Sequence, residues 1–351
     1  MCKQIKAVKA GSRTLYSLIK FRLTGKPTPV CVIFQITKHC NLHCVYCYAN
    51  KEALKDVPDL TYEEFTGLVD QIYTLGGRWI RFLGGEPLMR NDIGKMIRYA
   101  NDKGMMTEMN TNGYFMEGKT NNLRELDSLV ISIDGTKETN DKCRGQGSYD
   151  KAINAIELAK NIGIPMRLHG CLSCYHTIDD INHLAELSEK YDVAFNFSAP
   201  SPIYFEDDKR MSCHPSQEQV AMIHQRCIEL KAEGYNITTT NAGAKYVKKW
   251  PGKRDVLTKE DNPPKGSYVP CVNGKLFCTI DVDGNVYPCA GYWRDGVNAK
   301  QIGFRYAWEH LHHLPCLSCN YSANIELSLL FRLSPRAIKE VLIYLFKRIG
   351  L

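Results

Sequence analysis

The chain has 351 residues, of which 44% are apolar and 24% charged, as in ordinary globular proteins with a large core. No run approaches the roughly 18 uncharged apolar residues of a membrane-spanning helix, and the N-terminus lacks the apolar core of a secretory signal, so we expect a cytoplasmic protein. In that reducing compartment an odd number of cysteines, fifteen, argues against a disulfide framework and favours metal ligation or redox chemistry.

The positive charge is concentrated at the N-terminus. Residues 1–26 contain no acidic residue and seven basic ones, which equal the net charge of +7: Lys3, Lys6, Lys9, Arg13, Lys20, Arg22 and Lys26. The rest of the chain is near neutral, so we expect no nucleic-acid partner, because such proteins carry a basic folded face. Apolar residues are interleaved, and residues 1–28 are predicted as a basic amphipathic arm. Such an arm either makes a peripheral contact with an anionic membrane or packs on the core.

From about residue 29, short apolar segments alternate with amphipathic ones. The predicted strands are rich in apolar or β-branched residues: Val30–Thr37, Trp79–Leu83, Met105–Asn110, Ser128–Ile133, Met166–Leu172 and Ala194–Ser198. The predicted helices between them are 61–76, 91–103, 118–126, 148–162 and 179–190. This alternation indicates parallel βαβ units. Six units are too few for a closed eightfold barrel, so we expect an α/β fold with an open, partial (β/α)6 barrel over residues 29–235.

After about residue 200 the alternation stops. The predicted elements are a helix at 215–233, a Lys-, Pro- and Gly-rich linker or loop at 243–267, strands at 277–282 and 285–287, and a helical end at 324–349. Asp283-Gly284 between the two strands is a hairpin turn signal. The helical end breaks at Ser334-Pro335. Residues 323–351 are therefore predicted as C-terminal amphipathic helices, with the same two alternatives as the N-terminal arm.

Cys40, Cys44 and Cys47 lie directly after the first predicted strand. Thiolates hold iron–sulfur clusters, and three thiolates leave one iron of a cubane without a protein ligand. S-adenosylmethionine (SAM) can chelate that iron through its amino and carboxylate groups. The carboxyl end of a strand is also where barrel active sites lie. The alternative is a zinc site in which His39 or His43 is the fourth ligand.

The spacing Cys-x3-Cys-x2-Cys, with the aromatic Tyr46 before the last cysteine, resembles the signature of radical SAM enzymes. Three further segments of that family's pattern each end a predicted strand: Gly84-Gly85-Glu86-Pro87, Thr111-Asn112-Gly113 and Ser132-Ile133-Asp134-Gly135. The resemblance covers about residues 30–200 and implies a SAM-binding [4Fe-4S] cluster on the three cysteines. The cofactor-contacting residues that it implies are Tyr46, Gly84, Gly85, Glu86, Asn112, Ser132, Asp134 and Arg144. Arg144 follows Asn140-Asp141, where many relatives have His-Asp.

Four more cysteines are spaced as a second ligand set: Cys271, Cys289, Cys316 and Cys319. Four thiolates can close every iron of a cubane, and the hairpin at Gly284 would bring the first two together. Cys278 is an alternative to Cys271, and zinc is an alternative metal. The pattern resembles the SPASM/twitch extension of radical SAM enzymes, here over residues 236–322. No cysteine follows Cys319, which favours the twitch form with one auxiliary [4Fe-4S] cluster.

Five polar or cysteine residues on the last two predicted strands have no assigned role. Cys171 and Cys174 are predicted on opposite faces of one strand, which favours core or barrel-lining positions over shared ligation. Arg167, His169 and Asn196 either line the barrel, in contact with SAM or substrate, or are structural.

The resemblance implies an oxidoreductase or modifying enzyme. Such an enzyme cleaves SAM to a 5′-deoxyadenosyl radical and abstracts a hydrogen atom from a peptide, a sugar-like small molecule or a lipid. The auxiliary cluster would transfer an electron or position the substrate, and a reductant such as flavodoxin or ferredoxin would supply electrons. The rival hypothesis is a non-enzymatic zinc or iron–sulfur protein, a binding or electron-carrier module. In it Glu86, Asn112 and Ser132 would have no shared purpose.

Overall fold

The computed structural model describes residues 3–47, 56–199, 213–250, 252, 255–313 and 316–340. Its centre is one nine-stranded sheet in the order β10-β9-β8-β1-β2-β3-β4-β5-β6. The strands of this sheet are β1 (Cys31–Gln35), β2 (Trp79–Leu83), β3 (Met106–Thr111), β4 (Ser128–Ser132), β5 (Met166–Cys171), β6 (Ala194–Ser198), β8 (Phe277–Ile280), β9 (Asn285–Tyr287) and β10 (Val297–Asn298). Strands β1 to β6 and β8 run parallel, which confirms the predicted barrel units.

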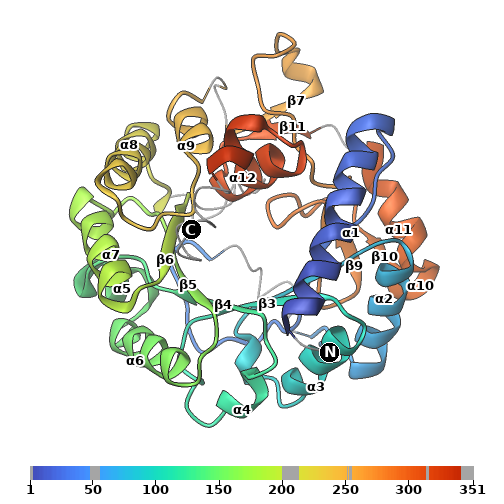
Figure 1. The fold of residues 1–351 in the computed structure, drawn as a ribbon, viewed down its shortest axis with the longest axis horizontal. Coiled ribbons are helices and arrows are strands. Elements are labelled where there is room, and N and C mark those ends of the chain that lie inside the picture. Colours follow the sequence, from blue (N-terminus) through green and yellow to red (C-terminus); the bar gives the residue numbers. More distant parts are fainter. Residues whose placement is uncertain are drawn as a thin grey trace.

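Helices surround the curved sheet on its outside (Figure 1). They are α1 (Lys3–Thr24), α2 (Tyr62–Thr74), α3 (Ile93–Asp102), α4 (Thr120–Leu123), α5 (Lys137–Arg144), α6 (Ser148–Asn161), α7 (Ile178–Tyr191), α8 (Gln217–Glu233), α9 (Asn241–Lys248), α10 (Ala299–Ile302), α11 (Phe304–His310) and α12 (Ser322–Phe331). A separate antiparallel pair joins β7 (Val256–Thr258) and β11 (Cys316–Cys319). None of the described helices is long and apolar enough to cross a membrane.

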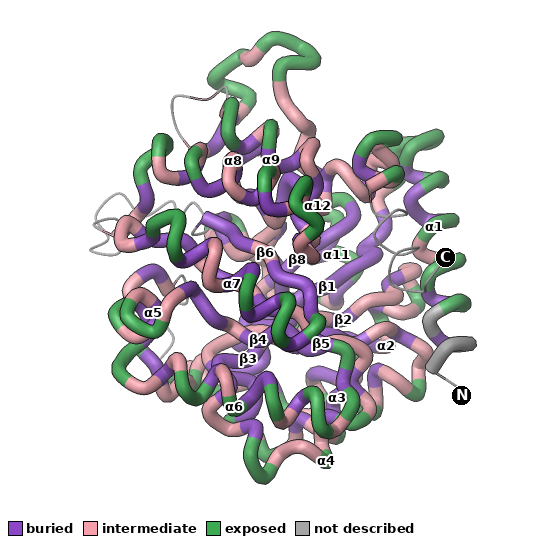
Figure 2. The backbone as a smooth tube through the Cα atoms, turned by 60° about the vertical axis from the view of Figure 1, so that its left-hand side comes forward, coloured by how far each residue is buried: buried purple, intermediate pink, exposed green. Residues whose placement is uncertain are grey.

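The barrel strands have two distinct faces because successive side chains alternate. In β1, Phe34 faces outward and packs edge-on against Phe65 of α2, with ring centroids 4.9 Å apart. On the inner face Arg81 and Arg167 flank the buried Glu108, at 2.7 and 2.5 Å. In Figure 2 the strands are accordingly buried, while the outer sides of the helices are exposed. The outer face therefore forms the apolar core, and the inner face is available for polar chemistry.

The described helices α5, α9, α10 and α11 lie where the sequence predicted no helix, and the first two show why. α5 was not predicted, because Cys143 is the only apolar residue in it; it is held instead by the Thr136 side chain, which accepts from the Thr139 N–H (3.4 Å). α9 lies in the stretch predicted as a linker. It forms because Thr240 caps its first turn, accepting from the Gly243 N–H (2.9 Å), and because Val247 is buried.

The predicted hairpin around Gly284 is present but extends the barrel sheet. β8 pairs with β9 antiparallel and also with β1 in parallel, with Val32 opposite Cys278. Gly284 has φ +91°, and a Cβ there would lie 2.6 Å from Cγ of Lys300, so the turn requires glycine. The C-terminal part of the chain is thus bonded to the first barrel strand through continuous backbone pairing.

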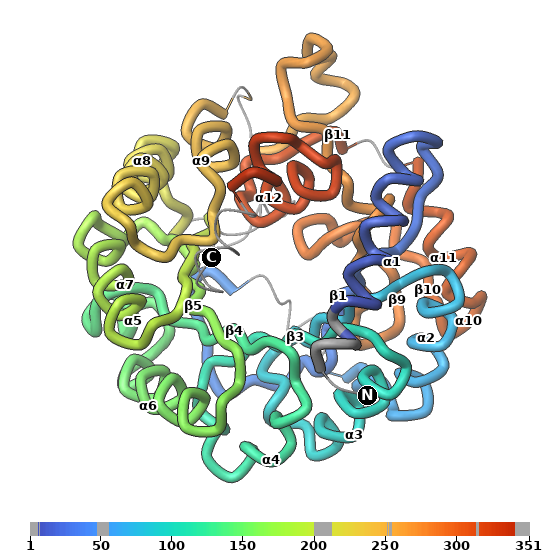
Figure 3. The backbone as a smooth tube through the Cα atoms, in the orientation of Figure 1, coloured from blue at the N-terminus to red at the C-terminus, as the bar shows by residue number. Residues whose placement is uncertain are grey.

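α12 lies between β6 and β8, the two outer strands of the parallel part of the sheet (Figure 3). The Ser322 hydroxyl donates to the Phe197 carbonyl of β6 (3.1 Å), and Phe331 packs with Phe277 of β8. After α12 the chain breaks at Ser334 and resumes as helix at Pro335, as predicted; residues 341–351 of the predicted C-terminal helices lie outside the described residues. The helix therefore closes the open side of the barrel.

Glu326 of α12 makes the stability of this closure depend on pH. Its Oε1 accepts from the Thr240 N–H (2.9 Å), while Oε2 has no partner among the described residues. Burial raises the pKa of Glu326 from 4.5 to about 8, so the folded state holds this proton more tightly than the unfolded state. Its stabilising contribution is therefore complete below pH 4.5 and is lost as the pH rises through about 8.

We expect Glu326→Gln to remove this loss of stability at alkaline pH. Glutamine keeps the acceptor for Thr240 and has no charge to bury, so at alkaline pH it should be more stable than wild type by about 2–5 kcal/mol. Urea unfolding measured across this pH range checks the expectation. Parallel curves for the two proteins would contradict it.

Candidate active site

A cavity of about 960 Å³, open solvent at its mouth included, lies at the carboxyl ends of the barrel strands. Cys40, Cys44 and Cys47 all line it. Seven of the eight predicted cofactor-contacting residues line it as well: Tyr46, Gly84, Gly85, Glu86, Asn112, Ser132 and Arg144. Segments from the carboxyl ends of six strands, β1 to β6, thus meet around one space.

The cysteine loop is fixed by backbone hydrogen bonds. The Leu42 N–H points to Sγ of Cys40 (3.4 Å), and the Val45 N–H donates to the carbonyl of Cys143 in α5 (2.9 Å). Burial raises the pKa of the Cys44 thiol to about 12, so metal binding there must displace a proton. His39 and His43, the candidate fourth zinc ligands, are exposed and do not line the cavity.

Across the described ranges no three His, Cys, Asp or Glu side chains converge closely enough to chelate a single ion. The cysteines surround a cavity instead. A cubane is a body of eight atoms whose thiolate ligands are distributed around it, and this arrangement suits such a body.

The glycine pair after β2 allows two loops to touch. A Cβ on Gly84 would lie 2.4 Å from the Thr37 carbonyl oxygen, and one on Gly85 would lie 2.1 Å from that of His39. The Gly85 N–H donates to Thr37 (2.7 Å) and the Glu86 N–H donates to His39 (2.8 Å). The loop after β2 is therefore bonded directly to the segment that leads into the cysteines.

Glu86 joins the loops after β2 and β3. Its carboxylate accepts from the Leu88 N–H (3.0 Å), the Thr111 hydroxyl (2.8 Å) and the Asn112 N–H (2.8 Å). Burial raises the pKa of Glu86 to about 7, against these hydrogen bonds, which lower it. Both oxygens are thus engaged with the protein, and Glu86 positions Asn112, whose Nδ2 lies 3.9 Å from Sγ of Cys40.

Asp134 is the exception among the predicted residues, because it lies beneath the cavity rather than in its wall. It is fully buried and binds Arg144 through two bonds, of 2.7 and 2.9 Å. The hydroxyl of Tyr46 and the N–H of Cys171 (2.9 Å) also donate to it. Asp134 itself does not line the cavity; it holds Arg144 and Tyr46, which do.

The far wall of the cavity contains residues whose role the sequence left open or did not indicate. His169 and Cys171 of β5 line it, and Nε2 of His169 lies 3.1 Å from Oγ of Ser198. Burial lowers the pKa of His169 to about 4, so it is neutral. Tyr321, directly before α12, also lines this wall, and nothing in the sequence pattern pointed to it.

The other residues of β5 and β6 whose role the sequence left open do not line the cavity. Arg167 binds Glu108, and Asn196 does not line the cavity. β5 ends at Cys171, so Cys171 and Cys174 are not on one strand; Cys174 lies outside the cavity, and its N–H donates to the Cys213 carbonyl (2.9 Å).

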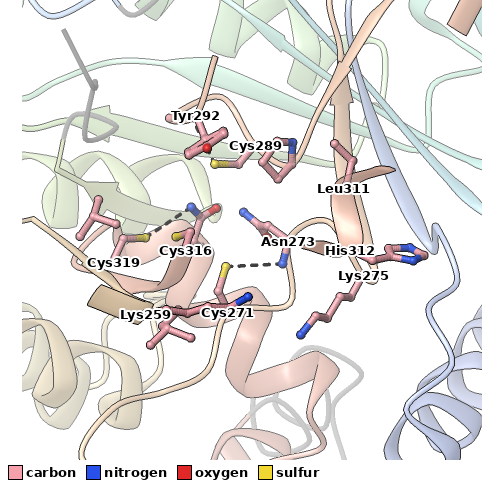
Figure 4. A pocket seen from close by; sticks show the side chains of 15 residues that line it. Lys259, Cys271, Asn273, Lys275, Cys289, Tyr292, Leu311, His312, Cys316 and Cys319 are labelled. Carbon is pink, nitrogen blue, oxygen red and sulfur yellow. Dashed lines mark hydrogen bonds between the residues drawn. The ribbon is translucent and has the colours of Figure 1, made fainter. Parts of the chain in front are cut away.

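The second set of cysteines lines a separate cavity of about 750 Å³, open solvent included (Figure 4). Its ligand candidates are Cys271, Cys289, Cys316 and Cys319. Cys278, the alternative to Cys271, lies in β8 within the apolar core and does not line this cavity. Burial raises the pKa of each of the four thiols, that of Cys271 to about 12.

Amide groups point at these sulfur atoms. Backbone N–H groups lie 3.5 Å from Sγ of Cys271 and 3.4 Å from Sγ of Cys289, and Nδ2 of Asn324 lies 3.5 Å from Sγ of Cys319. Hydrogen bonds to sulfur are one of the means by which proteins set the potential of iron–sulfur clusters. The donor set and its surroundings therefore suit a cluster ligated entirely by the protein.

Sequence comparison identifies the family. The profile of the radical SAM superfamily matches residues 34–188. Fe-coproporphyrin III synthase of Methanosarcina barkeri is 34% identical over 49% of this chain, which spans only 43% of that protein. The mycofactocin maturase MftC of Mycolicibacterium smegmatis is 25% identical over 82% of this chain and 71% of its own length. The AdoMet-dependent heme synthase of Methanosarcina barkeri is 25% identical over 80% and 82%.

Solved structures share the fold beyond the barrel. SuiB of Streptococcus suis, bound to its precursor peptide SuiA, has a TM-score of 0.65 at 16% identity over 84% of this chain and 68% of its own. AdoMet-bound anSMEcpe has a TM-score of 0.63 at 18% identity over 89% and 94%. These findings set aside the non-enzymatic alternative. The chain is therefore an enzyme with a radical SAM domain at residues 34–188.

Proposed function

We propose that the chain oxidises a polar organic substrate by radical SAM chemistry. Cys40, Cys44 and Cys47 hold a [4Fe-4S] cluster that binds SAM, and the second cysteine set holds an auxiliary [4Fe-4S] cluster that accepts an electron. The observation that carries this proposal is the convergence of the three-cysteine loop and the glycine loop after β2 in one cavity. When bound, the first cluster supplies the electron that cleaves SAM to methionine and the 5′-deoxyadenosyl radical, which takes a hydrogen atom from the substrate.

The residues around the cavity bind and orient the cofactor. Arg144, held by Asp134, presents its guanidinium to the SAM carboxylate. Gly84 and Gly85 allow the amino group to approach their backbone, and Ser132 and Asn112 offer polar groups to the rest of the molecule. Because these groups are locked by hydrogen bonds to one another, they need little reorganisation on binding.

The far wall favours a polar substrate. His169, Ser198 and Tyr321 provide hydrogen-bonding groups there, which suit a peptide or a sugar-like metabolite better than a lipid chain. The likeness to the peptide-bound SuiB structure supports a peptide in particular.

Tyr321 links this wall to the second cysteine set, which supports a role of the auxiliary cluster as electron acceptor. Tyr321 lines the first cavity, follows Cys319 by two residues and interacts electrostatically with Cys289. Hydrogen abstraction leaves a carbon radical on the substrate, and loss of one further electron and one proton completes a two-electron oxidation. A cluster held by Cys271, Cys289, Cys316 and Cys319 would supply an acceptor for that electron.

Anaerobic reconstitution tests the proposal. We expect about eight irons and about eight sulfides per chain, as two cubanes require. With a strong reductant and SAM, the protein should form 5′-deoxyadenosine. Zinc without sulfide, or eight irons with no SAM cleavage, would refute it.

The amide of Asn324 gives a sharper test of the auxiliary site. It lies 3.5 Å from Sγ of Cys319, and an N–H donor stabilises the more negative, reduced state of a cluster. We expect Asn324→Leu to make the midpoint potential of the auxiliary cluster more negative, as measured by redox titration followed by EPR. Asn112→Leu is the matched control, because its amide faces Cys40 and should shift only the first cluster. Equal shifts in both variants would contradict the assignment.

A further inference from the structure

α1 has two apolar faces, and the fold uses only one. Ala10, Leu18 and Phe21 are buried against the protein. Five large apolar side chains of the same helix are exposed: Val8 (71%), Leu15 (50%), Tyr16 (67%), Ile19 (42%) and Leu23 (79%). At about 100° per residue these five lie within an arc of about 100°, opposite the buried side. They are half of the ten exposed large apolar side chains in the described part of the chain.

The helix is anchored with this second face outward (Figure 2). Nζ of the buried Lys6 binds Asp127 (2.5 Å) and Asn101 (2.6 Å), and Arg13 donates to the Tyr73 hydroxyl (3.1 Å). Asp127 directly precedes β4, Asn101 lies in α3 before β3, and Tyr73 lies in α2 before β2. α1 therefore lies across the amino ends of the barrel strands, on the side away from the SAM cavity.

Positive charge flanks the exposed stripe on both sides. At the same angular spacing, Lys9 and Lys20 lie along one border and Arg22 along the other, and all three are exposed. Residues 1–26 contain no acidic side chain. Burial lowers the pKa of Arg332, which follows α12, and the charge of Arg22 lowers it further. Arg332 is therefore a further cation near the C-terminal end of α1.

An apolar stripe bordered by cations has the pattern of a helix that lies in the interface of an anionic bilayer. We propose that α1 docks the protein on an anionic lipid surface, with Val8, Leu15, Tyr16, Ile19 and Leu23 among the acyl chains and the flanking cations at the headgroups. A nucleic acid would use the cations but not the apolar stripe. The charge around the stripe also disfavours a second copy of this chain, because two such faces would bring like charges together.

Flotation with the full-length protein tests this docking. Phosphatidylcholine vesicles, with or without phosphatidylglycerol, are the probes. We expect binding to the anionic vesicles, at least tenfold weaker binding to the neutral ones, and loss of binding in high salt, because screening removes the headgroup attraction. No binding to anionic vesicles would overturn the proposal, as would equal binding to both.

Surface variants identify the face that binds. Leu15→Ser with Leu23→Ser should lower binding on the order of tenfold or more, because both side chains face water in the free protein and are buried only by the lipid. Met222→Ser with Tyr306→Ser, which removes exposed apolar groups from α8 and α11, is the matched control and should bind as wild type.

Two results would show that the exposed apolar stripe of α1 does not dock on lipid. If sedimentation shows a wild-type dimer and a monomeric Leu15/Leu23 variant, the stripe is a self-association surface and the lipid proposal fails. It also fails if both double variants bind anionic vesicles as well as wild type does. Unchanged thermal unfolding and unchanged 5′-deoxyadenosine formation in solution verify that the variants are folded, and these readouts are independent of the membrane.

Discussion

Replacement of Cys44 by alanine is expected to reduce 5′-deoxyadenosine formation below detection and to lower the iron content from about eight to about four per chain. Cys44 lines the first cavity between Cys40 and Cys47, and two thiolates cannot hold a cubane with one open iron. Liquid chromatography of the nucleoside products, together with iron and sulfide analysis, measures both effects. The spectrum of the auxiliary cluster should remain, since its cysteines line a different cavity.

Two other cysteines serve as controls. Cys174→Ala removes a half-exposed thiol that lines neither cavity and should leave both readouts unchanged. Cys171→Ala is more stringent, because Cys171 lines the first cavity together with Cys44. We expect it to keep four irons at the first site. If it loses them, the site has four protein ligands and no iron open to SAM.

Arg144→Met is expected to destabilise the folded protein by about 3–5 kcal/mol, because it leaves the fully buried carboxylate of Asp134 without its counter-charge. The same variant should lose SAM binding, since Tyr46 and the cavity wall depend on this pair. Urea unfolding and equilibrium binding of SAM measure the two effects. Lys137→Met, at the other end of α5, breaks an exposed pair with Asp150 and should leave the free energy of unfolding nearly unchanged.

The effect of Arg144→Met should depend on pH with a definite sign. Burial acts to raise the pKa of Asp134, but the charge and hydrogen bonds of Arg144 lower it below its usual 3.8. In wild type the pair therefore stabilises the fold above that pH and is lost as the pH falls. In the variant burial dominates and the carboxyl binds its proton more tightly when folded, so stability falls as the pH rises. A stability difference that does not grow with pH would contradict this account.

Most of the barrel could be predicted because its strands and most of its helices have a local signal. Strand β2, with Ile80 and Phe82 buried and Arg81 between them, shows the alternation of a two-faced sheet in its sequence. α5 had no such signal, because its stability comes from the Thr136 cap and from contacts with distant segments. The pairing of β8 with β1 also had none, since it joins residues about 250 positions apart.

The residues of the site likewise fall into those that the sequence could predict and those that it could not. The cysteines and the glycine pair could be found because their chemistry requires a fixed spacing or a missing side chain. Tyr321 and Ser198 could not, because a residue becomes part of a cavity wall only after distant strands are brought together. The pattern selected Asp134 correctly as a residue of this region, but only the three-dimensional arrangement separates a cofactor contact from a residue that holds one.

Because β8 pairs with β1 in parallel, we expect the barrel not to fold once the C-terminal extension is removed. Every residue of β1 is buried, and the strand reads Cys-Val-Ile-Phe-Gln. A fragment that ended near residue 235 would leave β1 as an unprotected edge strand, with a row of unsatisfied N–H and C=O groups on an apolar segment. Such edges template pairing between molecules, so the fragment should aggregate rather than fold. We therefore expect the barrel and its cysteine-rich extension to fold as a single unit that cannot be divided near residue 235.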